Sequence, residues 1–187
     1  MKTTLKGALI AAVLCLTLAA PATAAEEASK GMTFGIVDIN KVLQAAEAAK
    51  GILGELEGKR KEFQTQITKE EDSLRAFETS VMKEKEKLSK EDFEKKRKEF
   101  EEKMVTAQKM VQDKKRLLDQ AFGDSMGKLR TEALKVSAEI SKERGFDAVF
   151  TQDALVLAEK DLDITDEVLE RVNKNIKKIP VVWAAKK

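Results

Sequence analysis

The segment RGFDAVFTQDALVLAEKDLDITDEVLE, residues Arg144–Glu170, decides the fold of this chain. It begins where a long charged stretch ends, and its apolar residues alternate over 146–150 as they do in a strand. TQDA predicts a turn, LVL (155–157) a second strand, and the residues after Thr165 a helix over Asp166 to about Lys177. A hairpin this small needs more apolar surface beside it, so other parts of the protein must supply a neighbour.

A further short strand is expected near the start of the chain. MTFGIVD, residues Met32–Asp38, is rich in apolar residues that alternate. Three short strands form a sheet with two open edges and too little apolar cover to be stable in a single chain. We therefore expect strands from several copies of the chain to join in one oligomer. The residues expected to form this oligomerisation body are Phe34, Ile36, Phe146, Val149, Phe150, Leu155 and Leu157.

The long stretch between the strands has a helical repeat. From Lys41 to about Leu88, apolar residues recur every seven positions, which predicts a helix packed on a partner helix. Ser89 can cap a second helix, and Gly145 is placed to end it. Segments 41–88 and 90–144 would each be roughly 70–80 Å long at about 1.5 Å per residue, so they are expected to fold back into a hairpin. The repeat comprises Leu53, Ile67, Leu74, Val81 and Leu88, then Leu56, Phe63 and Phe77, and, after a shift of phase in the second helix, Phe122, Met126 and Leu129.

These elements predict an α+β fold that is mostly α. A long antiparallel coiled-coil helical hairpin, the arm, extends from a small three-stranded β body that oligomerises. The expected boundaries are 25–40 for a leader and the first strand, 41–144 for the arm with its tip near 88–92, 145–178 for the body hairpin and terminal helix, and 179–187 for a C-terminal tail. Trp183, the single tryptophan, is expected to pack against the body rather than to anchor in a membrane.

Residues 1–24 have the layout of a secretory signal peptide. A basic start with Lys2 and Lys6 precedes the apolar stretch GALIAAVLCLTLAA and the small residues Ala22-Thr23-Ala24. A membrane anchor is the alternative, but the apolar stretch is shorter than the roughly 20 residues needed to span a bilayer. Cleavage would remove the only cysteine and would change the balance of 35 basic and 33 acidic residues to 33 and 33. We expect an exported protein whose mature form has no net charge.

The sequence lacks the residues on which most catalytic and metal sites depend. It has no His and no Tyr, and its one Cys falls in the predicted signal peptide. Without histidine, a Ser or Thr hydroxyl lacks the usual general base. GELEGKR (54–60) lacks the glycine spacing of a phosphate-binding loop and lies in a predicted helix. We expect no catalytic residue, metal site or cofactor, and no nucleic-acid binding, because an exported chain without an aromatic stacking platform is poorly suited to it.

Three features in this order resemble one protein family. They are FGIVDINKVLQ (Phe34–Gln44), the long heptad-bearing hairpin, and GFDAVFTQDALVLAEKDLDITDEVL (Gly145–Leu169). Over about Met32 to Asn173 the chain is similar to the Skp (OmpH-like) family of periplasmic chaperones. The resemblance implies a homotrimer whose arms surround a cavity and hold unfolded outer-membrane β-barrel proteins, without ATP, until they are inserted in the outer membrane. The alternative is a non-catalytic coiled-coil scaffold or adaptor of the cell envelope.

A holdase of this kind needs a surface that many unfolded chains can touch weakly, and flexible methionines suit that role. Candidate client-binding residues on the arm are Phe77, Met82, Phe93, Phe100, Met104 and Met110. The alternative is that they pack the two arm helices together. A basic cluster is predicted at the arm tip, which could contact anionic lipid head groups or acidic client segments or be a solvated mixed-charge tip. It comprises Lys83, Lys85, Lys87, Lys90, Lys95, Lys96, Arg97 and Lys98.

Overall fold

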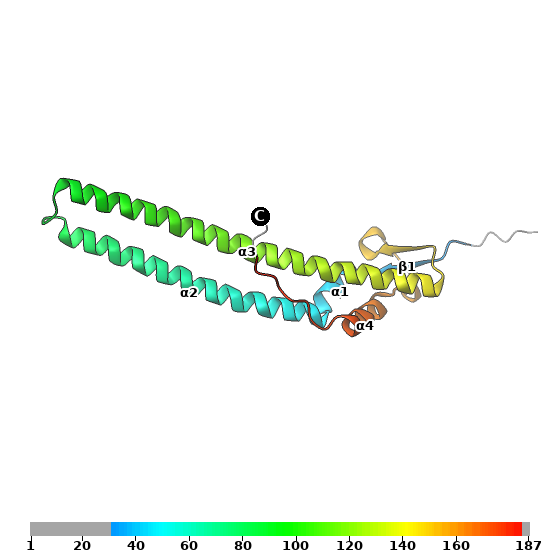
Figure 1. The fold of residues 1–187 in the computed structure, drawn as a ribbon. Coiled ribbons are helices and arrows are strands. Elements are labelled where there is room, and N and C mark those ends of the chain that lie inside the picture. The colour runs from blue at the N-terminus through cyan, green and yellow to red at the C-terminus, as the bar shows by residue number, and fades with distance from the viewer. Residues whose placement is uncertain (1–30, 185–187) are drawn as a thin grey trace, which may run out of the picture. The chain divides into compact units, whose positions relative to one another are not determined.

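The computed structural model describes residues 31–184, so the predicted signal peptide lies outside the described residues. Most of the described residues are helical, and the strands are few and short (Figure 1). The elements in chain order are β1 (Phe34–Val37), α1 (Ile39–Ala45), α2 (Glu47–Glu84), α3 (Lys90–Arg144), β2 (Ala148–Thr151), the 3-10 turns η1 (Gln152–Ala154) and η2 (Lys160–Leu162), and α4 (Thr165–Asn175).

The helical hairpin predicted from the heptad repeat is present as α2 and α3, which lie side by side and antiparallel (Figure 1). At the tip, the Ser89 hydroxyl accepts a hydrogen bond from the Asp92 N–H (3.1 Å) and donates one to the Asp92 carboxylate (2.7 Å). At the other end of α3, Gly145 has φ 68°, a left-handed conformation that glycine adopts without strain. Ser89 and Gly145, which were expected to start and end the second helix, therefore do so.

The first helical segment is interrupted at Ala46, which the sequence does not indicate. Ala46 has φ −58° and ψ 139°, so the chain leaves helical geometry between α1 and α2. The side-chain oxygen of Asn173 in α4 accepts a hydrogen bond from the Glu47 N–H (2.8 Å) and so caps the new helix. Alanine is the best helix former, so the break comes from tertiary contacts with α4 rather than from local preference.

The sheet contains two strands within the described residues, and they are parallel. Phe34 pairs with Ala148 and Val37 with Thr151, while the other edge of β1 forms a single bridge from Ile36 to Asp163. The prediction of a third strand at 155–157, paired in a hairpin, is wrong for the single chain. The Leu155 N–H closes the turn η1 by donating to the Gln152 carbonyl (3.1 Å), and residues 155–157 do not pair with β2 in the described sheet.

Gly35 is needed where β1 passes the end of the arm. A Cβ atom at this position would lie 2.8 Å from Cε2 of Phe146, closer than real side chains approach. The backbone N–H of Asp147 donates to the Thr33 carbonyl (2.8 Å), and the Thr33 N–H donates to the Asp147 carboxylate (2.8 Å). These contacts hold the start of β1 against the start of β2. In the sequence, the whole arm separates the two strands.

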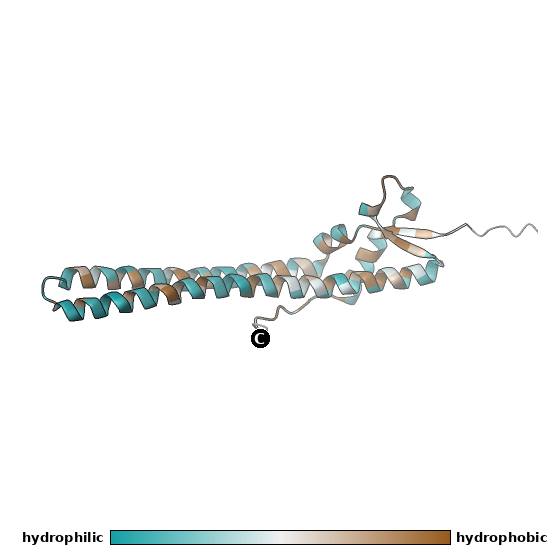
Figure 2. Cartoon of the chain, turned by 90° about the horizontal axis from the view of Figure 1, so that it is seen from above, coloured by the Kyte–Doolittle hydropathy of each residue, from teal (hydrophilic) through white to brown (hydrophobic). Residues whose placement is uncertain are grey.

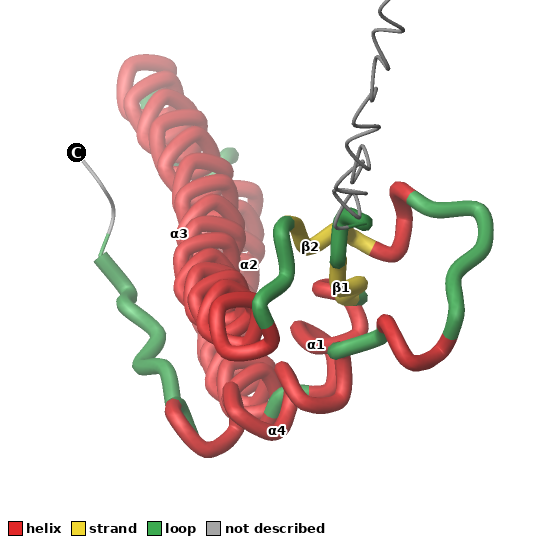
Figure 3. Tube along the Cα trace, turned by 90° about the vertical axis from the view of Figure 1, so that its right-hand side faces the viewer, coloured by secondary structure: helices red, strands yellow, loops and turns green. Residues whose placement is uncertain are grey.

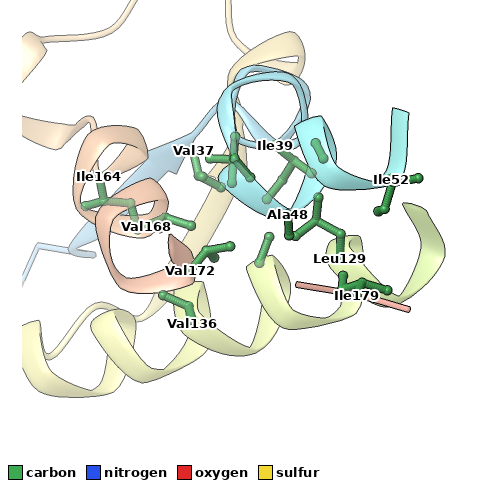
Figure 4. Close-up of a cluster of buried hydrophobic side chains, with 14 of the residues drawn as sticks. Val37, Ile39, Ala48, Ile52, Leu129, Val136, Ile164, Val168, Val172 and Ile179 are labelled. Atoms are coloured by element: carbon green, nitrogen blue, oxygen red, sulfur yellow. The ribbon is translucent and has the colours of Figure 1, made fainter. Parts of the chain in front are cut away.

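The main core lies where α1, α4 and the ends of the two arm helices meet (Figure 4). The amide of Asp38 donates to the Thr165 hydroxyl (2.8 Å), and the Asp38 carboxylate caps α1 by accepting from the Lys41 N–H (2.8 Å). One chain therefore buries a substantial body core, and β1 is part of it through Val37, which is 2% exposed. The fully shielded side chains of this core include Val42, Ile52, Leu129, Val136, Ile140, Val168 and Val172.

The buried face of α3 near the body differs from the prediction. Phe122 was placed in the helix interface, but it is 43% exposed, and the buried positions are the small residues Ala121 and Ser125. Leu53 of α2 was also placed there and is 54% exposed. Small residues are buried on both helices near the body, since Ala48 and Ala49 of α2 are buried too.

Beyond the body the arm is largely hydrophilic, with isolated apolar positions (Figure 2). The buried residues of α2 in this part are Phe63, Leu74 and Val81, each 7–9% exposed. The seven-residue repeat thus produces a thin apolar seam, and charged side chains cover the rest of both helices. Within residues 31–184, no helix combines the length and the apolar character required to cross a membrane.

Candidate functional site

The outer part of the arm is held together by aromatic rings with lysines around them. The rings of Phe77 and Phe100 stack across the hairpin, with centroids 6.3 Å apart and an interplanar angle of 2°. The ammonium groups of Lys96 and Lys103 lie 5.9 Å and 5.6 Å from the Phe77 ring centroid, within the range of cation–π attraction. Both phenylalanines are half-buried and pack the two helices of the hairpin together.

The methionines proposed as contact residues occupy different environments. Met82 is 60% exposed and Met104 40% exposed, so both present flexible apolar surface to solvent. Met110 is half-buried and lines a cavity on the hairpin. Phe93 is also half-buried, with the Lys85 ammonium 5.7 Å from its ring centroid.

That cavity, the arm cavity, has a volume of about 480 Å³ and joins the two helices at Phe63. Its apolar lining includes Met110 and Leu117, and its rim carries Lys109 and Arg116. The ammonium groups of Lys59 and Lys114 lie 5.1 Å and 4.4 Å from the Phe63 ring centroid. The cavity therefore combines an apolar floor with a mainly basic rim.

The predicted basic cluster surrounds the turn at the arm tip, but acidic neighbours pair with part of it. Lys96 lies 3.8 Å from Glu84 across the hairpin, and Lys95 lies 3.2 Å from Glu91. Arg97 lies between Glu94 (3.4 Å) and Glu101 (3.6 Å). Such exposed pairs are weak and screened by salt, so the tip is a mixed-charge surface with a local excess of lysine.

Several exposed apolar residues of the arm were not among the predicted contact residues. Val105, beside Met104, is 64% exposed, and Val111 is 41% exposed. Near the body, Leu53 and Phe122 line a second cavity of about 420 Å³. The sequence does not mark Val105 and Val111 as exposed. Both are apolar, and only the observed hairpin shows that they do not point inward.

In the body, the residues expected to mediate oligomerisation divide into two groups. Ile36 is buried, and Phe146 packs beside Gly35. Phe34 meets Phe150 edge-on, with ring centroids 5.6 Å apart and an interplanar angle of 79°. Val149 and Leu155 are half-buried, whereas Phe150 is 39% and Leu157 91% exposed. The neighbouring Val156 is fully exposed, so the loop after β2 presents an apolar tip that one chain does not cover.

Ion pairs attach α4 to its neighbours. The Arg171 guanidinium donates to both carboxylate oxygens of Glu143 (2.8 and 2.7 Å) and to Glu167 (2.6 Å). The hydrogen bonds from Arg171 lower the pKa of Glu143, and a hydrogen bond from Lys41 (2.9 Å) lowers the pKa of Asp166. Lys41, Glu143 and Asp166 are exposed, whereas Arg171 and Glu167 are half-buried, and the pairs join α4 to α1 and α3.

Nothing in residues 31–184 gathers three or more metal-ligating side chains. The prominent feature is a charged hairpin with apolar side chains distributed along its length (Figure 2). Such a surface can make many weak contacts with a chain that lacks fixed structure, because isolated apolar residues need no matching shape in the partner.

The family model described as "Outer membrane protein (OmpH-like)" matches residues 33–172. Among curated proteins, none matches the chain. A solved structure from Caulobacter crescentus CB15, described as a "putative outer membrane chaperone (OmpH-like)", superposes with a TM-score of 0.73 at 15% sequence identity. The match covers 80% of this chain and 88% of that one, and it shows that the two share a fold.

Proposed function

Because the chain belongs to the OmpH-like family, we propose that it is a non-catalytic, ATP-independent periplasmic holdase for unfolded outer-membrane β-barrel proteins. The observation that carries the proposal is the arm surface. Met82, Met104 and Val105 are exposed on a hairpin whose other surface is charged and hydrated. Contacts of this kind are individually weak, which suits capture and release without nucleotide hydrolysis.

The proposed holdase is a homotrimer that encloses its client between three arms. Support comes from the body, where the exposed loop around Leu157 and the outer edge of β2 lack a partner strand among the described residues. Open strand edges pair readily with other strands. Pairing of these edges between copies would place three arms around one space, with the methionine-bearing surfaces available to the client.

The test is whether the purified protein prevents aggregation of a denatured outer-membrane β-barrel protein diluted into nucleotide-free buffer. We expect light scattering by the client to fall as the chaperone approaches a stoichiometric amount. A double variant, Met82→Ser with Met104→Ser, should hold the client less well. Thr79→Ser, on the same helix as Met82, should leave holding unchanged. Aggregation at the same rate with and without the protein would refute the proposal, and binding to a single folded envelope protein instead would favour a scaffold.

A further inference from the structure

Residues 176–184 run from α4 along the arm in an extended conformation, and we call this segment the tail (Figure 1). It lies on the opposite side of the hairpin from the sheet (Figure 3). Its side chains alternate: Ile179 and Val181 are 5% and 8% exposed and Trp183 is half-buried, whereas Pro180 is exposed and Val182 is 54% exposed. An extended chain turns successive side chains to opposite faces, so the tail applies every second residue to the arm.

The surface that receives the tail is built mainly by α2. Glu55, Lys59 and Phe63 follow each other at intervals of four residues and so share one edge of this helix. We call this edge, with Leu129 of α3 beside Ile179, the tail groove (Figure 4). The Lys59 ammonium lies 5.9 Å from the Trp183 ring centroid and 5.1 Å from that of Phe63, so it bridges the two aromatic rings.

One of the two polar contacts in the tail groove is made by the main chain and so does not depend on which side chain occupies that position. The Glu55 carboxylate accepts a hydrogen bond from the backbone N–H of Val181 (3.4 Å) and pairs with Lys178 (3.0 Å). The hydrogen bond from Lys178 lowers the pKa of Glu55. A main-chain hydrogen bond combined with apolar contacts at alternate residues is how strand-like peptides are commonly recognised.

The tail groove also continues beyond the tail. Phe63, next to Trp183 through Lys59, belongs to the lining of the arm cavity, together with Met110 and Leu117. An extended segment longer than the tail would therefore find further apolar surface along the same edge of the hairpin. The tail covers one end of a longer surface.

We propose that the tail groove binds extended polypeptide with an apolar side chain at every second residue, and that the tail occupies it until such a segment of a client displaces it. This inference rests on the proposed function, because strands of outer-membrane barrels alternate apolar and polar residues in this way. The apparent affinity for client is then the intrinsic affinity multiplied by the fraction of molecules whose groove is free, so a docked tail lowers it.

The adjacent residues Val181 and Val182 offer a matched pair of variants in the full chain. Val181→Asp places a charge on the buried face of the tail and should undock it, whereas Val182→Asp places the same charge on the exposed face. The probes are two labelled synthetic peptides of one composition, with valine and leucine either alternating with threonine and lysine or grouped together. If the tail is docked about nine-tenths of the time, the alternating peptide should bind Val181→Asp about tenfold more tightly than the wild type or Val182→Asp.

Equal affinity for all three proteins, or equal binding of the two peptides, would overturn the inference. Should Val181→Asp fail to fold, the wild type still decides: the alternating peptide must increase acrylamide quenching of Trp183, the sole tryptophan. The two proposals can fail separately. If the protein prevents client aggregation but the three proteins bind the alternating peptide equally, only this inference is refuted. If the peptide binds as expected but client aggregation is not prevented, only the proposed function is refuted.

Discussion

Four helices converge in the body, and Val42, Leu129, Val136 and Val172 are completely shielded there. In the outer arm, by contrast, no side chain of α3 between Lys90 and Gln120 is buried. Both regions are helical, but the first gains its stability from burying apolar surface, and the second has a thin seam with weak charge pairs around it. The difference places most of the folding free energy in the body and leaves the arm free to open locally.

The largest expected effect compares one substitution in the two regions. Leu129→Ala in the body should lower the free energy of unfolding by about 3–5 kcal/mol, because the cavity it leaves is enclosed on all sides. Leu74→Ala in the arm seam should cost only about 2 kcal/mol or less, because the site borders solvent and can collapse. Urea denaturation followed by circular dichroism measures both. Equal losses would mean that the arm and the body are equally packed.

Replacing a glycine by alanine should change stability in opposite directions in the two regions. Gly35→Ala should destabilise the protein by about 1–3 kcal/mol, because the added Cβ overlaps the Phe146 ring. Gly58→Ala, in the middle of α2 with open space around it, should stabilise the arm by about 0.5–1 kcal/mol through its higher helix preference. Thermal unfolding of the two variants would reveal the signs, and a stabilising Gly35→Ala would show that β1 is not tightly packed.

Asn173→Ala tests the joint between the two regions. Removing the acceptor for the Glu47 N–H should cost about 1 kcal/mol, as loss of a helix cap does. Asn175→Ala is the control, because its side chain only contacts the exposed Glu132 carboxylate (3.0 Å). Hydrogen exchange should speed up at the first turn of α2 in Asn173→Ala alone. Faster exchange throughout α2 would indicate that the whole arm depends on this cap.

The smallest expected effect is on acid stability. The folded pKa of Asp166 lies below its ordinary value, so the pair with Lys41 stabilises the fold above the unfolded pKa of about 4 and loses that effect as the pH falls through the folded pKa. Asp166→Asn should therefore be less stable than the wild type at neutral pH and equal to it in strong acid. Urea unfolding at a series of pH values gives the difference, and a difference that stays constant down to strong acid would contradict the assignment.

The sequence predicts features that local chemistry controls. Ser89 caps a helix and Gly145 ends one because short-range hydrogen bonds and backbone freedom decide these positions. Contacts between distant segments decide the features that the sequence did not indicate. Nothing in the run of alanines around Ala46 marks the break that Asn173 stabilises. The parallel pairing of β1 with β2 depends on the arm returning to the body, and the bridge from Ile36 to Asp163 joins residues that are far apart in sequence.

Because β1 and β2 are paired by their own hydrogen bonds and enter the sheet at the two ends of the hairpin, the arm is in effect an insertion in a body that closes beneath it. Removing one seven-residue unit from each helix between the body and the tip would keep the interhelical register and shorten the reach by roughly 10 Å at about 1.5 Å per residue. The length of the arm can thus increase or decrease without redesign of the part that folds.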